Sequence, residues 1–163
     1  MITVSIVTYK TNLEELSQCL HSLTSSLISR IYIVDNSNQQ YIADFCQQYT
    51  NVEYIGSKNV GYGAGHNQAL RQVLGSEEEY HLVLNSDVYF NPSVLKYLVE
   101  YMDAHPDVGQ VQPNVVYPDG EQQYTCRLLP TPANLIFRRF LPKGIMEKMN
   151  IRYQLKFNDH KRE

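Results

Sequence analysis

Short runs of β-branched and other apolar residues alternate along the first hundred residues with segments whose apolar residues recur every three or four positions. The short runs predict strands over residues 2–8, 30–34, 52–55 and 81–84. The helically spaced segments predict helices after Asn12, around residues 41–49, over 64–74, and from Asn91-Pro92 to near residue 105. This alternation predicts an α/β fold with an open, mostly parallel sheet and helices on both faces.

The first predicted helix shows both a start signal and an apolar stripe. Asn12 and Glu15 have the spacing of a capping box, in which two side chains satisfy free backbone N–H groups at a helix start. Leucines then follow with helical spacing at positions 13, 16, 20, 23 and 27. We therefore expect one face of this segment to be buried as far as Leu27.

The pattern changes after residue 107. Residues 108–112 form a short strand-like segment, Tyr117-Pro118-Asp119-Gly120 is a turn signal, and residues 121–125 return as a second strand. This predicts a β-hairpin beyond the parallel sheet. We expect one domain over residues 1–130, followed by a tail over residues 131–163 for which the sequence predicts no element.

Charge is distributed unevenly. The net charge is −3, yet residues 138–163 hold eight of the 14 lysines and arginines. The acidic body argues against nucleic-acid binding. The basic tail is expected to be solvated or to pack on another segment, with peripheral contact to an anionic membrane surface as the alternative. No stretch approaches the roughly 20 apolar residues that span a bilayer, so we expect a cytoplasmic protein, with a place at the inner face of the membrane as the variant.

Several common sites are disfavoured by missing motifs. The three cysteines form no CxxC pair, which argues against zinc and disulfide frameworks. Residues 8–12 contain no glycine where a dinucleotide-binding fold needs G-x-G-x-x-G, and no P-loop Gly-Lys-Ser/Thr is present. A dehydrogenase is therefore disfavoured, although a nucleotidyltransferase with a similar alternation stays open.

Polar residues follow every predicted strand. Because ligands of open parallel sheets bind at the carboxyl ends of the strands, these residues are expected to converge on one edge. The segments are Thr8-Tyr9-Lys10, Asp35-Asn36-Ser37-Asn38, residues 59–67, which carry glycines at 61, 63 and 65, and Asn85-Ser86-Asp87.

This edge suits a nucleoside diphosphate and a metal ion. Asp35 can accept from a pyrimidine or a ribose hydroxyl, and the glycines allow backbone N–H groups close approach at a helix start. A plain turn or cap accounts equally well for either feature alone. Asp87, directly after an apolar strand, can hold Mg²⁺ or Mn²⁺ against phosphate oxygens; the alternative is a turn residue before Asn91.

Four segments resemble, in order, the motifs of the family 2 glycosyltransferases. Residues 5–10 are similar to SIVTYN, residues 33–37 to VVDNxS, residues 59–67 to NxGfgaxxN and residues 82–88 to LxLNPDv, the family's variant of the metal-binding DxD. Lys10 stands in place of Asn, and Ser86 in place of Pro. The resemblance covers residues 1–116, and the bacterial rhamnosyltransferase-like members are the most similar.

The resemblance implies a GT-A fold that transfers a sugar, with inversion, from a UDP- or dTDP-sugar to the hydroxyl of a saccharide or lipid-linked saccharide, in cell-surface polysaccharide synthesis. It implies Mg²⁺ or Mn²⁺ on Asp87. The implied nucleotide-sugar-binding residues are Thr8, Tyr9, Asp35, Asn36, Asn59, Gly61, Gly63, Asn67, Arg71, Asn85 and Ser86.

The family's acidic acceptor-side motif, which supplies the general base, has no counterpart after Val116. Asp119 on a turn is a poor substitute, because a base must reach the attacking hydroxyl. We therefore expect the donor-binding part of a longer enzyme, with no catalytic residue assigned. The alternative is a non-catalytic interaction protein that keeps the fold and binds no nucleotide.

Overall fold

The computed structural model describes residues 1–125, 128, 129 and 153. The chain forms two compact units, Met1–Asp107 and Val108–Glu163. The expected division at residue 130 stays a prediction, and the expected basic tail lies outside the described residues except for Tyr153.

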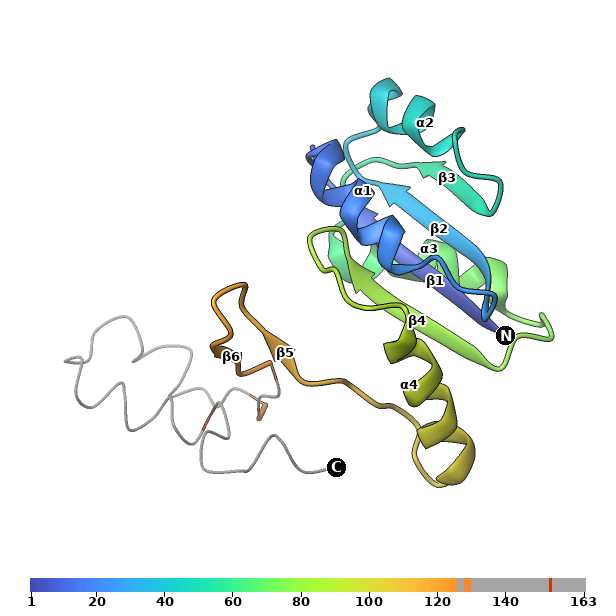
Figure 1. Cartoon of the computed structure of the whole chain (residues 1–163). Helices are drawn as coiled ribbons and strands as arrows, with labels where there is room; N and C mark the ends of the chain where they lie inside the picture. Colours follow the sequence, from blue (N-terminus) through green and yellow to red (C-terminus); the bar gives the residue numbers. More distant parts are fainter. Residues whose placement is uncertain (126–127, 130–152, 154–163) are drawn as a thin grey trace. The chain divides into compact units, whose positions relative to one another are not determined.

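The first unit contains a four-stranded parallel sheet in the order β3-β2-β1-β4 (Figure 1). All four strands were expected from the apolar runs, and the predicted α/β fold is confirmed. Their bounds are Ile2–Thr8 for β1, Ile28–Asp35 for β2, Val52–Gly56 for β3 and Tyr80–Asn85 for β4.

Four helices cover the sheet on its two faces. α1, α2 and α4 contribute side chains to the larger apolar core, whereas α3 packs on the opposite face through Ala69 and Val73. Right-handed crossovers require this division, because the chain runs from β1 to β3 in one direction and then returns to β4 on the far side of β1. The helices are α1 Leu13–Ser22, α2 Gln40–Cys46, α3 Tyr62–Val73 and α4 Ser93–Ala104.

Successive side chains of β1 point in turn to the face of the sheet covered by α1 and to the face covered by α3. Val4 and Ile6 are fully buried in the core under α1, whereas Val7 packs in the cluster under α3. Thr3 and Ser5, on the side of Val7, are buried as well. A strand buried on both faces thus has an apolar side and a largely polar one, and the polar side faces α3.

The helix ends differ from expectation in four places, the simplest being α2, which ends at Cys46 rather than near residue 49. α1 ends at Ser22, because Ser25 Oγ accepts from the backbone N–H of Leu27 and favours a turn there. α3 begins two residues early, since Gly61, at φ 87°, ends the preceding loop and its carbonyl accepts from Gly65 N. At α4, the cap is Pro92, although Asn91 Oδ1 still accepts from Ser93 N.

The second unit contains the predicted hairpin with a shifted first strand. β5 Val115–Val116 pairs antiparallel with β6 Gln122–Gln123, and Gly120 N donates to Tyr117 O in the turn between them. The strand expected over residues 108–112 is not formed. Within the described part of the chain, no helix has the length and apolarity to cross a membrane.

Candidate functional site

The carboxyl ends of β1 and β4 lie side by side, although they are more than 70 residues apart in the sequence. The chain leaves β1 toward one face through α1 and reaches β4 from the other face through α3. Open α/β sheets bind their ligands at the carboxyl edge, at the point where the strand order reverses in this way. The segments that meet there are Tyr9–Lys10 after β1 and residues 85–87 after β4.

Tyr9 is an accessible aromatic residue of this edge, with 54% of its surface exposed. Lys10 adopts a left-handed backbone, with φ 52°, and its ammonium lies 5.5 Å from the centre of the Tyr9 ring. Lys10 N donates to Ser37 Oγ at 3.0 Å, which ties the loop after β1 to the loop after β2. Both residues that follow β1 are therefore placed where a ligand can reach them.

Asp35, at the end of β2, is completely buried. Oδ1 accepts from Ser37 N at 2.9 Å, Ser37 Oγ at 2.6 Å and Thr8 Oγ1 at 3.2 Å. Oδ2 accepts from Gln39 N at 2.6 Å and Tyr54 Oη at 3.2 Å. Burial by itself raises the pKa of Asp35, but the hydrogen bonds from Ser37, Gln39 and Tyr54 outweigh it and hold the pKa below its ordinary value.

The bonds of Asp35 join β1, the turn after β2, and β3. Thr8 is also buried, so its hydroxyl faces Asp35 rather than the crevice. The Thr8 hydroxyl proton is used in its bond to Asp35, and both oxygens of Asp35 already accept hydrogen bonds. Both predicted site residues lie at the expected edge, and in this arrangement they form its buried support.

The start of α3 closes the edge between β1 and β2. Asn59 Oδ1 accepts from Gly61 N at 3.2 Å, and Asn36 Nδ2 donates to Gly61 O at 3.2 Å. Gly61 and Gly63 are exposed, and neither has other atoms within 4 Å of an added Cβ. The first-turn N–H groups of α3, which have no partner inside a helix, therefore lie at an open surface.

Asn85, Ser86 and Asp87 form the end of the site beyond β4. Asn85 and Asp87 are exposed, and Ser86 Oγ lies 3.5 Å from Thr11 Oγ1 in the loop after β1. In the loops that follow the four strands, Asp87 is the one exposed carboxylate. The described residues include no cluster of three His, Cys, Asp or Glu that could hold a metal by itself.

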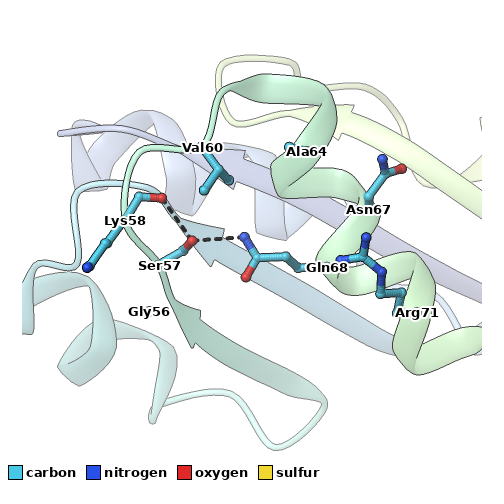
Figure 2. A pocket seen from close by; sticks show the side chains of 8 residues that line it. All are labelled: Gly56, Ser57, Lys58, Val60, Ala64, Asn67, Gln68 and Arg71. Carbon is cyan, nitrogen blue, oxygen red and sulfur yellow. Dashed lines mark hydrogen bonds between the residues drawn. The ribbon is translucent and has the colours of Figure 1, made fainter.

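Asn67 and Arg71 lie on the flank of α3 rather than at its start. They line a pocket of about 530 Å³ beside the loop after β3, together with Ser57, Lys58 and Gln68 (Figure 2). Figure 2 shows the Arg71 guanidinium turned toward Gln68, whose amide donates to Ser57 Oγ at 2.8 Å. The structure thus divides the predicted residues between the β1/β4 crevice and this pocket.

Tyr62 was missed by sequence reasoning. Its hydroxyl donates to Asn85 Oδ1 at 2.6 Å, so the first residue of α3 is joined to the end of β4. The sequence did offer one sign of its role. Tyr62 comes directly after Gly61 and is the first residue of a helix that starts at the carboxyl edge of the sheet. The sequence gives no sign that its partner is Asn85, 23 positions away.

The missing general base stays a prediction. Asp119, the substitute considered from the sequence, belongs to the second unit, where its Oδ1 accepts from Glu121 N at 2.9 Å and stabilises the hairpin turn.

Comparison with known proteins gives one family and one fold. The model of the family "Glycosyl transferase family 2" matches residues 3–160. The crystal structure of S. aureus TarS 1–349 is 22% identical over 71% of this chain and 41% of that chain, with a TM-score of 0.52. The same TarS piece in complex with UDP is 21% identical over 74% of this chain and 43% of that chain, also with a TM-score of 0.52.

A longer TarS structure is 21% identical over 72% of this chain and 24% of that chain, with a TM-score of 0.51. The chain thus spans less than half the length of these structures, and at such identities the likeness shows the fold. A search of curated proteins finds no significant match.

Proposed function

Because the chain belongs to glycosyl transferase family 2, we propose that it binds a nucleotide-diphosphate sugar in the crevice between β1 and β4. The observation that carries this proposal is the convergence at one edge of an exposed aromatic ring, an open helix start and a single exposed carboxylate. Tyr9, the first turn of α3 and Asp87 supply these three features. They match the base, the phosphates and the metal-bound end of such a donor.

The chemistry of each group suggests how the donor lies. The exposed ring of Tyr9 offers a face on which a pyrimidine stacks. The free N–H groups at the start of α3, with the positive end of the helix dipole, attract a diphosphate. Asn36, Asn59, Gly61 and Gly63 shape this turn, and Asn67 with Arg71 would contact parts of the donor that reach the flank of α3.

A divalent cation fits Asp87. Mg²⁺ prefers oxygen ligands and needs only one or two protein carboxylates when substrate phosphates and water complete its shell. The edge has one such carboxylate, and the start of α3 lies beside it. When bound, Mg²⁺ or Mn²⁺ would neutralise charge on the departing diphosphate. Asp87 would hold the cation, and Ser86 would keep the turn before Asp87 close to Thr11.

The proposed reaction transfers the sugar to an acceptor hydroxyl. The acceptor oxygen attacks the anomeric carbon, the bond to the diphosphate oxygen breaks, and the configuration inverts. The acceptor proton goes to a base outside the described residues. We infer that this chain holds the donor side of the enzyme, and that the acceptor is a saccharide or lipid-linked saccharide of a cell-surface polysaccharide.

The nucleotide is proposed to be uridine or thymidine diphosphate. The UDP complex of TarS supports a uridine nucleotide in a protein of this fold, but this chain keeps Asp35 fully bonded and so leaves base selection to other groups. dTDP differs from UDP in the base methyl and the missing 2′-hydroxyl. A comparison of UDP and dTDP therefore tests whether the base methyl group and the 2′-hydroxyl affect binding.

Calorimetric titration with UDP and dTDP, each with and without Mn²⁺, tests the proposal. We expect saturable binding of at least one nucleotide that strengthens when Mn²⁺ is present. Binding that is equal with and without Mn²⁺ would remove Asp87 from its role. Absence of binding by both nucleotides would favour the interaction protein that keeps the fold without its ligand.

A further inference from the structure

The Tyr62 side chain crosses from the start of α3 to the end of β4. Its hydroxyl donates to Asn85 Oδ1 at 2.6 Å. Burial, and then the negative charge of Asp87, raise the pKa of Tyr62, so the phenol keeps its proton and acts as a donor. Tyr62 thus occupies one acceptor site of the Asn85 carbonyl oxygen, and the NH₂ group of Asn85 is left to donate to a ligand.

The His66 ring packs against the Tyr62 ring. The two ring centres are 4.5 Å apart, and the ring planes meet at 76°, an edge-to-face contact one helical turn apart on α3. His66 is only 4% exposed, and its Nδ1 lies 2.7 Å from Ser5 Oγ on β1. Tyr62 thus rests on a buried side chain that is bonded to the central strand of the site.

The direction in which the Thr3 hydroxyl donates sets the proton arrangement of the hydrogen bonds beneath α3. Thr3 Oγ1 donates to Tyr80 O at 3.4 Å and therefore accepts from His81 Nδ1 at 2.8 Å. His81 Nε2 is then an acceptor, so Ser5 Oγ donates to it at 2.8 Å and accepts from His66 Nδ1. Both imidazoles carry their proton on Nδ1. His66 Nε2 becomes a buried acceptor, and the described residues offer it no partner.

We propose that Tyr62 is a positioning residue that presents the Asn85 amide as a hydrogen-bond donor to the diphosphate, leaving metal coordination to Asp87. Phosphate oxygens accept hydrogen bonds and suit the Asn85 NH₂ group, whereas a cation needs an acceptor atom, and Tyr62 already donates to the Asn85 oxygen. The edge-to-face contact with His66 fixes the position and orientation of the Tyr62 ring. This inference rests on the proposed function and assigns the two ends of the Asn85-Ser86-Asp87 segment to different ligand atoms.

The test compares Tyr62→Phe with Tyr80→Phe. Tyr62→Phe keeps the ring on His66 and removes only the hydroxyl. Tyr80→Phe removes a hydrogen bond of similar length, 2.5 Å to Asp103, at the opposite end of β4. We expect UDP affinity in the presence of Mn²⁺ to fall about tenfold in Tyr62→Phe, as for one lost hydrogen bond, and to stay unchanged in Tyr80→Phe.

The Mn²⁺ concentration that UDP binding requires distinguishes two roles of Asn85, hydrogen-bond donor to phosphate and metal ligand. If Asn85 donates to phosphate, the Mn²⁺ concentration for half-maximal UDP binding stays unchanged in Tyr62→Phe. A higher Mn²⁺ requirement would show that Asn85 Oδ1 coordinates the metal, and would overturn the proposal. The double variant Tyr62→Phe/Asn85→Ala should bind UDP no more weakly than Asn85→Ala alone, since both changes act through one amide.

A second measurement needs no nucleotide. In the ligand-free protein, the side-chain amide NMR signals of Asn85, assigned by their loss in Asn85→Ala, should shift in Tyr62→Phe and not in Tyr80→Phe. Histidine ¹⁵N shifts should show the Nδ1–H form of His66 in both. Unchanged Asn85 signals in Tyr62→Phe would overturn the inference. If the unchanged protein binds no UDP, the donor proposal fails, and these spectra still decide the Tyr62–Asn85 link.

Discussion

Gly65 on α3 lies directly against Val7 at the end of β1. A Cβ atom placed on Gly65 would be 2.9 Å from Val7 Cγ2 and 3.0 Å from Val7 Cγ1, distances at which something must move. This close approach lets the helix start reach the carboxyl edge of the sheet, where the proposed diphosphate binds.

The first prediction follows from this contact. Gly65→Ala should lower the free energy of unfolding by about 1–3 kcal/mol, because the new methyl group overpacks the α3–β1 contact. Gly63→Ala is the matched control: it lies on the same helix with open space around its Cβ position. It should leave stability unchanged or raise it by up to about 1 kcal/mol. Urea unfolding measures both, and equal effects would contradict the packing argument.

Asp87→Asn tests the proposed metal ligand. The substitution keeps the size of the side chain and removes the charge that would hold a divalent cation. We expect the enhancement of UDP binding by Mn²⁺ to be lost, while circular dichroism and unfolding stay unchanged because Asp87 is exposed. Asp44→Asn, another exposed carboxylate, on α2, is the control. A variant that keeps the Mn²⁺ enhancement would place the metal elsewhere.

Asp35→Asn should act first on stability. The amide replaces one acceptor oxygen by an NH₂ group that faces existing donors, and it removes the charge that strengthens the remaining bonds. We expect a loss of about 2–4 kcal/mol in the free energy of unfolding. Asp44→Asn should change it by less than about 0.5 kcal/mol. A stable Asp35→Asn variant with weakened UDP affinity would instead make Asp35 a direct ligand.

Acid should destabilise the fold through His66, which is buried, and the partly buried His81. Burial, and then the nearby His81, lower the pKa of His66 to about 4, and burial lowers the pKa of His81 as well. Between the ordinary histidine value of 6.5 and about 4, the unfolded chain binds protons that folded His66 does not. The free energy of unfolding therefore falls as pH decreases through this window, and the His66 contribution is constant above it.

His66→Gln should flatten this pH dependence, because it removes the buried one of the two histidines whose pKa is lowered. His21→Gln changes an exposed histidine on α1, outside the Thr3–Ser5–His66–His81 network, and is the control. Urea unfolding at pH 7 and pH 5 measures the slope. Equal slopes in the unchanged protein and His66→Gln would exclude His66 as a source of acid sensitivity.

Membrane contact through the basic tail stays a prediction. Arg138, Arg139 and Lys143 changed together to Gln should reduce sedimentation with liposomes that contain anionic lipid, and neutral liposomes should bind neither protein. Equal sedimentation of the two proteins with anionic liposomes would discard the membrane contact.

Local sequence determined the elements and their order. Runs of β-branched residues form the strands of the parallel sheet, and Asn12 and Asn91 bond the first turns of helices through their own side chains. Turn glycines work in the same local way, as Gly61 does at the start of α3. These features depend on neighbours in the chain, which is why the strands and helices of the first unit and the turn of the hairpin were predictable within a few residues.

Only the tertiary structure decided which polar groups face a ligand. Asp35 and Asp87 both follow apolar strands, yet five donors from three elements surround Asp35, whereas Asp87 is exposed. The pairing of Tyr62 with Asn85 likewise requires β4 to lie beside β1 and α3 to cross the opposite face. Residue type and spacing specify a side chain's chemistry, but its remaining hydrogen-bonding capacity depends on partners that only the fold brings within reach.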